Sequence, residues 1–346
     1  MAVPVDWFYA TVNGACHILT VTGIHLETAS MGIVTAPAVK AAPALKDGIR
    51  KVWVGTEGGD LITIDAAYGT ILETVSFGGK VIYTGCHGPN VIVGMQDGRV
   101  FAVDAQTGVI RWSAQGTSQV NSAVETMDVL LVNYVSSRST AFDAYSGSIL
   151  WQAPYMANTA SADNGVFYLT SQFNPGMLLE ARRATDGSVI WNRPEPNFNY
   201  SGVTAVGDVV YVTTGDFKLY ALDASNGVAN WSSKTPFYSG TPLYAQEVVV
   251  VPIWNPGPPL GSSPGLAAYD VATGSESWVI GPLPGASIGE LPIAPLMRYF
   301  TGFIALPNAG IAFVCFSTGQ IFGQWNLGGY MSGLAYLHGP VAAWPL

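Results

Sequence analysis

Aspartate is the residue type in this chain whose spacing first suggests chemistry. Five aspartates each stand four residues before a glycine, and recurring carboxylates could act as acids and bases or bind calcium. They are Asp65, Asp104, Asp143, Asp223 and Asp270. An aspartate before a tight turn also accepts hydrogen bonds from turn amides that a sheet leaves unpaired. Because all five recurring aspartates stand at such turns, we expect hairpin caps and no calcium site.

The histidines and cysteines form no pattern of metal ligands or nucleophiles. His87 and His338 both lie in the tripeptide HGP, at the same turn of a repeating unit, so we expect repeat geometry there and not a metal site. Cys16, Cys86 and Cys315 lie far apart without CxxC spacing, which predicts buried free thiols. No GxSxG, HExxH or P-loop string occurs. We therefore expect no catalytic residue, no metal and no cofactor.

A repeat organises the whole chain around these residues. Its turn glycine occurs eight times at intervals of 39 to 47 residues, at Gly23, Gly69, Gly108, Gly147, Gly187, Gly227, Gly274 and Gly319. In five units a tryptophan follows the glycine by four residues, at Trp112, Trp151, Trp191, Trp231 and Trp278. Self-similarity at such a period is typical of propellers and solenoids.

The sequence pattern of each unit predicts four short strands. Residues 91–95, 99–104 and 109–114 read as three strands joined by tight hairpins, and residues 119–127 lead into the next unit. The turn glycine accommodates the positive φ that a short hairpin needs. The tryptophan then lies on the outermost strand, where it docks one unit on the next. Burying such a ring removes about 150–250 Å² from water, worth at most roughly 4–6 kcal/mol.

Eight units of four antiparallel strands predict an all-β fold, an eight-bladed β-propeller, with seven blades as the alternative. We expect one domain over residues 1–346. The C-terminal LAYLHGPVAAW is similar to residues 81–94, so the closing blade is predicted to be shared by both termini, with Tyr330–Leu337 as its innermost strand. Val5–Ala10 and Val341–Trp344 compete for the second strand.

The strings AVDAQTGVIRW and ALDASNGVANW resemble the A-x-D-x-x-T-G-x-x-x-W repeat of pyrroloquinoline-quinone (PQQ) type propellers. The resemblance covers nearly the whole chain and is weakest in the first and last units, where Glu27 and Gly323 replace the tryptophan. It implies a propeller fold, and the family contains both quinoprotein alcohol dehydrogenases and the scaffold lipoprotein BamB. The dehydrogenases hold their quinone with a vicinal Cys–Cys disulfide, a tryptophan floor and a calcium site. This shorter chain has no Cys–Cys pair, so we predict that it is not an enzyme.

The charge composition excludes some partners and favours others. Only 14 residues are Lys or Arg, the net charge is −9, and no basic cluster exceeds Arg182-Arg183, so we expect no binding to nucleic acid. No apolar run approaches the ~18 residues of a membrane-spanning helix. The N-terminal segment has no basic stretch typical of a Sec signal, which leaves the cytoplasm or a particle or surface assembly as its location. Charged residues make up 11%, few enough to favour a subunit buried among neighbours.

Irregular segments concentrate on one face of the predicted blades. They include residues 171–177, 253–265, 192–200, 232–240, 279–290 and 34–48, and they are rich in proline and aromatic residues. Rigid loops with aromatic residues are typical of protein interfaces. The candidate interaction surface is Phe173, Phe198, Tyr200, Phe237, Tyr238 and Trp254. Aromatic rings that only seal the loops onto the blades are the structural alternative.

These observations predict a non-catalytic propeller scaffold that contacts other protein subunits within a particle, envelope or filament. Three alternatives stay open. The first is a BamB-like envelope assembly factor. The second is a carbohydrate-binding propeller, in which the loop aromatics stack on glycans. The third is a degenerate quinoprotein.

Overall fold

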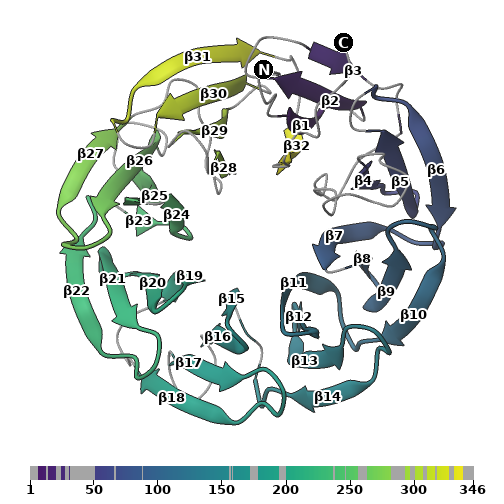
Figure 1. Cartoon of the computed structure of the whole chain (residues 1–346), viewed down its shortest axis with the longest axis horizontal. Helices are drawn as coiled ribbons and strands as arrows, with labels where there is room; N and C mark the ends of the chain where they lie inside the picture. Colours follow the sequence, from purple (N-terminus) through teal and green to yellow (C-terminus); the bar gives the residue numbers. More distant parts are fainter. Residues whose placement is uncertain are drawn as a thin grey trace, which may run out of the picture. The chain divides into compact units, whose positions relative to one another are not determined.

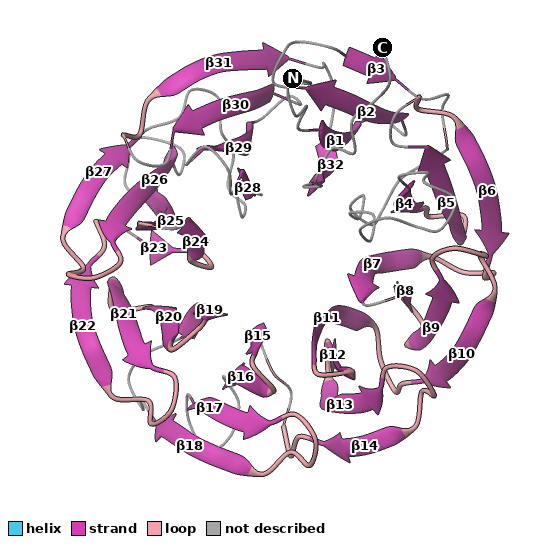
Figure 2. Ribbon diagram, viewed as in Figure 1, coloured by secondary structure: helices cyan, strands magenta, loops and turns pink. Residues whose placement is uncertain are grey.

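The structure is a computed structural model, and its described elements are all strands (Figure 1, Figure 2). It describes residues 7–12, 15–20, 25–27, 31, 51–65, 68–87, 89–155, 157, 159–171, 178–194, 200–236, 238–245, 247–255, 263–281, 293–296, 301–306, 310–315, 318–326 and 331–337. Within these ranges there is no helix that is long and apolar enough to cross a membrane.

The chain divides into two compact units. The first comprises Met1–Ser122, Tyr145–Gly147 and Asn326–Leu346, and the second comprises Ala123–Ala144 and Ser148–Trp325. Among the described residues the strands form six four-stranded sheets, one sheet of five strands and one of three. The pairing between neighbouring strands is antiparallel, as the predicted hairpins require.

The first unit holds three sheets. Their strands are β1 (Trp7–Val12), β2 (Ala15–Thr20), β3 (His25–Glu27) and β32 (Met331–Leu337); β4 (Lys51–Gly55), β5 (Asp60–Asp65) and β6 (Ile71–Ser76); and β7 (Val81–His87), β8 (Asn90–Met95), β9 (Arg99–Asp104) and β10 (Ile110–Gln115). The next sheet contains β11 (Val120–Thr126), which begins in the first unit, with β12 (Val129–Tyr134), β13 (Ser137–Asp143) and β14 (Ile149–Gln152).

The second unit holds the remaining sheets. Their strands are β15 (Thr159–Asp163), β16 (Val166–Ser171), β17 (Leu178–Arg183) and β18 (Val189–Pro194); β19 (Tyr200–Val206), β20 (Val209–Thr214), β21 (Lys218–Asp223) and β22 (Ala229–Lys234); β23 (Tyr238–Ser239), β24 (Leu243–Ala245), β25 (Val248–Asn255), β26 (Ser263–Asp270) and β27 (Glu276–Ile280); and β28 (Ile293–Leu296), β29 (Thr301–Leu306), β30 (Gly310–Cys315) and β31 (Ile321–Asn326).

One sheet is built from both termini. Strand β32 pairs with β1, with Trp7 opposite Leu337, and β1 pairs in turn with β2 (Figure 1). The predicted C-terminal strand Tyr330–Leu337 is confirmed as an edge strand of this sheet, beginning at Met331. The N-terminus supplies the second strand, which the prediction had left open between two segments. That strand is Trp7–Val12, two residues later than the predicted Val5–Ala10. The competing segment Val341–Trp344 lies outside the described residues.

Each sheet has two distinct ends. In the sheet β19–β22, Val209 is opposite Asp223 at one end and Thr214 is opposite Lys218 at the other. We call the first end, where strand one turns into strand two and strand three into strand four, the hairpin end. The other end is the link end, where strand two turns into strand three and the chain leaves for the next sheet.

The apolar core lies between consecutive sheets, because side chains alternate along each strand. Val210 and Val212 of β20 pack in a cluster with Trp191 of the preceding sheet. Tyr211, between them, packs in another cluster with Val249 of the following sheet. Sheets buried on both faces explain the second strands that are apolar at nearly every position. This all-β architecture is consistent with a β-propeller, whereas the number of blades, their closure and the single domain stay predictions.

Candidate functional site

Three residues of the predicted interaction surface lie in described strands, and all three are at link ends. Tyr200 is the first residue of β19. Tyr238 in β23 is the Cα partner of Trp254 in β25, so residues separated by sixteen positions in the sequence are neighbours in one sheet. The other three residues, Phe173, Phe198 and Phe237, lie outside the described residues.

The strand that begins at Tyr200 is in contact with the segment that follows Tyr238. Thr204 in β19 donates a hydrogen bond of 2.5 Å from Oγ1 to the carbonyl oxygen of Pro242. A Cβ added at Gly202 would come within 2.3 Å of the Thr241 Cα, which shows how closely the two backbones approach. Thr213 Oγ1 also donates to the Gly240 carbonyl at 2.8 Å. Short polar and glycine contacts thus hold these two neighbouring sheets together.

The five predicted docking tryptophans lie on the outermost strands of their sheets, and each ring lies against a turn glycine further along the chain. The pairs are Trp112 with Gly147, Trp151 with Gly187, Trp191 with Gly227, Trp231 with Gly274 and Trp278 with Gly319. A Cβ added at any of these glycines would come within 2.5 to 2.8 Å of the indole. These glycines also have φ between 70° and 74°, so both backbone conformation and ring packing require glycine there.

The indoles also make a hydrogen bond that sequence reasoning missed, as Trp151, Trp191 and Trp231 show. Trp151 donates from Nε1 to the carbonyl oxygen of Ala184 at 2.7 Å, and Trp191 donates to that of Ala224 at 2.8 Å. Trp231 does the same to Val271 at 3.0 Å. Each acceptor is the residue after the strand-three terminus of the next sheet. The signal that could have revealed it is the apolar residue that recurs at that position.

Glu73 occupies the tryptophan position in the unit of Gly69. Its carboxylate lies where a Cβ on Gly108 would be, as an indole does in the later units. The contact geometry of the repeat is therefore kept while the apolar ring is replaced by an exposed acid. This substitution marks the sheet β4–β6 as a unit with a weaker apolar connection to the next turn.

The recurring aspartates are hairpin caps, as predicted. Asp104 Oδ1 accepts hydrogen bonds from the backbone N–H of Gln106 at 2.9 Å and of Thr107 at 2.7 Å. Asp223 and Asp270 accept equivalent bonds in their turns. Partial burial alone would raise the pKa of Asp104, but the Arg111 guanidinium and the turn donors together lower it to about 2. These carboxylates are committed to turn structure.

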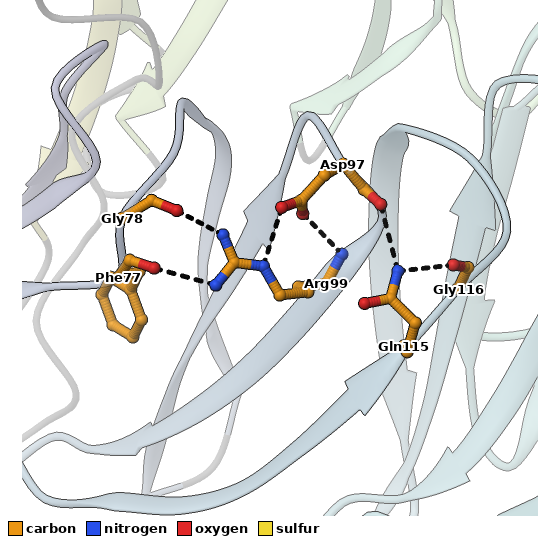
Figure 3. Close-up of polar contacts among 6 residues, drawn as sticks. All are labelled: Phe77, Gly78, Asp97, Arg99, Gln115 and Gly116. Atoms are coloured by element: carbon orange, nitrogen blue, oxygen red, sulfur yellow. Dashed lines mark hydrogen bonds and ion pairs between the residues drawn. The ribbon is translucent and has the colours of Figure 1, made fainter.

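An arginine clasp fixes one link between sheets (Figure 3). Arg99, the first residue of β9, donates from Nη1 to the Phe77 carbonyl at 2.8 Å and from Nη2 to the Gly78 carbonyl. Its Nε is held by Asp97 at 2.8 Å, and its guanidinium lies 5.5 Å from the Phe101 ring centroid. The fork geometry of arginine suits two adjacent carbonyl groups. The clasp therefore attaches the link before β7 to the start of β9.

A buried ionic cluster lies next to β17. The Tyr155 hydroxyl donates to Glu180 Oε2, which also accepts from Arg182 Nε at 2.6 Å. Arg182 donates in addition from Nη1 to the Gly187 carbonyl at 2.7 Å. Burial, and then the Glu180 carboxylate, raise the pKa of Tyr155 well above its ordinary value. The cluster is satisfied internally, which indicates a structural role.

In the described part of the chain, the histidine and cysteine side chains do not group into a metal-binding or catalytic site. The His87 ring lies 3.2 Å from the Tyr83 hydroxyl, and His338 is not described. Cys86 and Cys315 are free thiols, as predicted, but they are half-buried and not fully buried. The described residues contain no group of three His, Cys, Asp or Glu side chains able to hold a metal ion. The predicted absence of metals and cofactors stays a prediction.

A family model for the outer membrane protein assembly factor BamB, of the PQQ repeat type, matches residues 30–172 and 175–284. The chain belongs to this family. The resemblance stated from the repeat strings is therefore confirmed. Membership assigns the propeller fold and leaves the activity of this member open.

Curated relatives match shorter stretches of this PQQ-type propeller. The quinohemoprotein alcohol dehydrogenase ADH IIB of Pseudomonas putida is 39% identical over 90 residues, which cover 24% of this chain and 13% of the relative. The enzyme ADH-IIG of the same organism is 31% identical over 140 residues, 35% of this chain and 19% of the relative. The matches thus span less than a fifth of the length of either relative.

Solved structures share the fold at low identity. BamB from Moraxella catarrhalis gives a TM-score of 0.62 at 15% identity, over 94% of this chain and 93% of that one. The computationally designed Ika8 protein gives 0.69 at 13% identity, over 87% and 90%. A europium-containing methanol dehydrogenase gives 0.63 at 13% identity, over 82% and 77%.

These comparisons contradict the prediction that the chain is not an enzyme. Both curated relatives are alcohol dehydrogenases, and a methanol dehydrogenase has a similar structure. The prediction failed because it rested on residues that the sequence lacks. The repeat that the chain does contain is shared by the enzymes and by BamB, and cannot separate them.

The described residues do not fit the quinone site that the family resemblance implies. That site uses adjacent cysteines, and Cys86 and Cys315 are separate free thiols. It also uses acidic calcium ligands, whereas Asp104, Asp223 and Asp270 are engaged in their own turns. No reaction step through a quinone is therefore derived from these residues.

Proposed function

We propose that this PQQ-type propeller is a scaffold that binds another protein subunit through the link ends of its sheets, within a larger assembly. The observation that carries the proposal is the pairing of Tyr238 with Trp254, beside the strand that begins at Tyr200. Aromatic residues on neighbouring rigid strands are typical interface anchors. Membership in a family described as an assembly factor supports a protein as the partner.

The proposal also covers the number of blades and the closure of the ring. The sheets form one eight-bladed, closed propeller, in which every link end belongs to the same face. Eight turn glycines at regular spacing support the count. The pairing of β1 with β32, which brings both termini into one sheet, supports closure. A small-angle scattering profile that fits an open stack of sheets and not a ring would contradict it.

The experiment is recovery of the native partner on the tagged full chain. Complexes are captured from the source organism, and the proteins that bind at fixed stoichiometry are identified. We expect Tyr238→Ala with Trp254→Ala to reduce recovery of the partner by more than about tenfold, as loss of interface anchors does. Tyr145→Ala removes an exposed aromatic residue at a hairpin end and serves as the matched control. Equal recovery on both variants, with circular dichroism unchanged, would refute the proposal.

The carbohydrate-binding alternative is separated by the same variants. Binding on a glycan array that is lost in Trp254→Ala and kept in Tyr145→Ala would indicate stacking on sugar rings. No protein partner would then be expected at fixed stoichiometry.

A second candidate function is the propeller module of a quinoprotein-type dehydrogenase. It is favoured by the local identity of 39% with an alcohol dehydrogenase, over 90 residues that cover 24% of this chain. The test is to incubate the purified chain with pyrroloquinoline quinone and calcium and to measure dye-linked alcohol oxidation. Quinone-dependent oxidation would support this candidate. A protein fraction that carries no quinone absorbance after gel filtration would refute it.

A further inference from the structure

Phe217 has a backbone conformation that an aromatic residue rarely adopts. It lies in the turn between β20 and β21, at a link end, and its φ is 63°. The other described residues that combine a side chain with positive φ, Met127, Asp128 and Asn164, are at hairpin ends. Positive φ in a bulky residue is an outlier that costs stability. Such strain is concentrated at functional sites, so Phe217 calls for an explanation.

Glycine occupies the corresponding position in two other sheets. Gly59 follows β4 and Gly98 follows β8, with φ of 94° and 89°. Like Phe217, each donates its backbone N–H at 3.2 Å to the carbonyl group three residues earlier. The carbonyl group of each accepts a hydrogen bond of 2.8 to 2.9 Å from the first residue after strand four. The turn therefore requires positive φ, and glycine supplies it without steric cost in the other two sheets.

The side chain of Phe217 stands where backbone atoms lie in those two sheets. A Cβ on Gly59 would come within 2.4 Å of the Gly79 carbonyl oxygen, and a Cβ on Gly98 within 2.6 Å of the Ser118 carbonyl oxygen. At Phe217 a whole aromatic side chain is accommodated, and the residue is 39% exposed. Phenylalanine in place of glycine therefore strains the turn and places an aromatic residue at the surface of the link end.

The strained turn is connected to the strand that carries Tyr238. Thr235 donates its backbone N–H to the Phe217 carbonyl oxygen at 2.8 Å. Thr235 Oγ1 in turn accepts a hydrogen bond of 2.8 Å from Ser239 Oγ. Ser239 follows Tyr238 in β23, and the Cα partner of Tyr238 is Trp254. Two hydrogen bonds therefore join Phe217 to the pair of aromatic residues on which the proposed function rests.

Residues 214–218 and 234–236, which form this turn and the segment bonded to it, retain one positive charge. Asp216 and Lys218 pair with each other at 3.1 Å. The remaining charge is that of Lys234, which is exposed, as is Pro236 on the other side of Thr235. Complementary charges across an interface favour the correct partner and its register. An exposed ring near an exposed ammonium group suits an apolar side chain that lies beside a carboxylate.

We propose that Phe217 anchors the protein partner at this link end, and that the partner presents an apolar side chain to Phe217 and a carboxylate to Lys234. The strained turn is retained because its aromatic ring serves binding and not folding. Aromatic residues are among those that contribute most to the binding energy of protein interfaces. This inference rests on the proposed function, adds an anchor that the sequence did not reveal, and states the chemistry of the partner segment.

The strain is measured without any partner. Phe217→Ala and Phe217→Gly both remove the ring, but only glycine relieves the positive φ. Denaturant unfolding of the full chain should give Phe217→Gly a folding equilibrium constant about three- to tenfold above that of Phe217→Ala, because the strain relieved exceeds the extra entropy of glycine in the unfolded chain. Equal constants would show that the turn is not strained and would overturn the inference.

Binding is tested with a random peptide library displayed on phage and selected on the purified full chain. We expect enriched peptides in which an apolar residue lies beside Asp or Glu, and whose affinity falls by more than about tenfold on Phe217→Gly. Phe217→Tyr keeps the ring and should keep the affinity, whereas Lys234→Gln should weaken binding of the acidic peptides. Val228→Ala removes an exposed apolar side chain at the hairpin end of the same sheet and is the matched control.

The outcomes separate this inference from the proposed function. No enriched peptide, or peptides that bind Phe217→Gly as tightly as the unaltered chain, would overturn the inference, as would glycan binding that depends on Phe217 when no peptide is enriched. Recovery of a native partner that needs Tyr238 and Trp254 but not Phe217 would refute the anchor alone. Peptide binding that needs Phe217, with no native partner recovered, would refute the proposed function alone.

Discussion

The indole of Trp191 donates a hydrogen bond of 2.8 Å from Nε1 to the carbonyl oxygen of Ala224, in the next sheet. The same ring covers Gly227, whose φ is 73°. One side chain therefore contributes buried apolar area, a hydrogen bond and close packing against a turn. Since the arrangement recurs in several sheets, it sets the distance between a sheet and the hairpin of its successor.

The first prediction concerns the fit between Trp191 and Gly227. Gly227→Ala and Gly207→Ala both place a side chain at positive φ, which costs about 1–2 kcal/mol. A Cβ at Gly227 would also come within 2.7 Å of the Trp191 ring, whereas a Cβ at Gly207 meets no atom within 4 Å. We therefore expect Gly227→Ala to lower the free energy of unfolding by about 1–3 kcal/mol more than Gly207→Ala. Denaturant unfolding of both variants measures the difference.

A double-mutant cycle checks the cause. Trp191→Ala alone should cost about 3–5 kcal/mol. In that background the excess cost of Gly227→Ala should disappear, because no ring remains to be displaced. An excess that persists without the indole would show that the backbone, and not ring packing, requires glycine.

The second prediction compares two buried tyrosines. Tyr155 donates its hydroxyl to Glu180, and loss of a hydrogen bond to a charged group costs about 1.5–3 kcal/mol. The Tyr134 hydroxyl has no hydrogen-bond partner among the described residues, and burial raises its pKa to about 12. We expect Tyr155→Phe to lower the free energy of unfolding by that amount and Tyr134→Phe to leave it unchanged or raise it. Equal losses in the two variants would contradict the assignment.

The third prediction is a pH dependence from Asp104. Its pKa in the folded chain is about 2, below the ordinary value of 3.8, so the unfolded chain binds the proton more readily. The stability that Asp104 contributes is therefore complete above pH 3.8 and is lost as the pH falls toward 2. Asp104→Asn should flatten the curve of unfolding free energy against pH in this window. Arg111→Gln should flatten it partly, because the guanidinium lowers the pKa; an unchanged slope in both variants would exclude Asp104 as a source of acid sensitivity.

The repeat, its strands and its turn chemistry could be read from the sequence because they depend on local patterns. An aspartate four residues before a glycine predicts a capped hairpin, and Asp104 with Gly108 forms one. The use of both termini in one sheet also followed from similarity between distant segments. The choice of Trp7–Val12 as the second strand did not, because two apolar segments satisfied the same alternation.

Contacts between distant side chains could not be read from the sequence. Nothing in the spacing of Tyr155, Glu180 and Arg182 predicts a shared ionic cluster, since it depends on where a link passes over β17. The pairing of Tyr238 with Trp254 likewise depends on the register of two strands. Missing motifs did not exclude enzyme activity, and the repeat that is present does not decide it, because dehydrogenases and BamB share that repeat.

The last prediction concerns the Arg99 clasp. Arg99→Lys keeps the charge but cannot donate to the Phe77 and Gly78 carbonyls together, so the link before β7 should open more often. The Phe77 and Val81 amides are bonded to the Gly59 and Thr56 carbonyls, and their hydrogen exchange reports this opening. We expect exchange at both amides to become about tenfold faster, which corresponds to about 1.4 kcal/mol. Lys80→Gln removes only an exposed ion pair with Glu57 and should change exchange much less. If both variants exchange alike, the link is held by its backbone hydrogen bonds and the forked contact of Arg99 is dispensable.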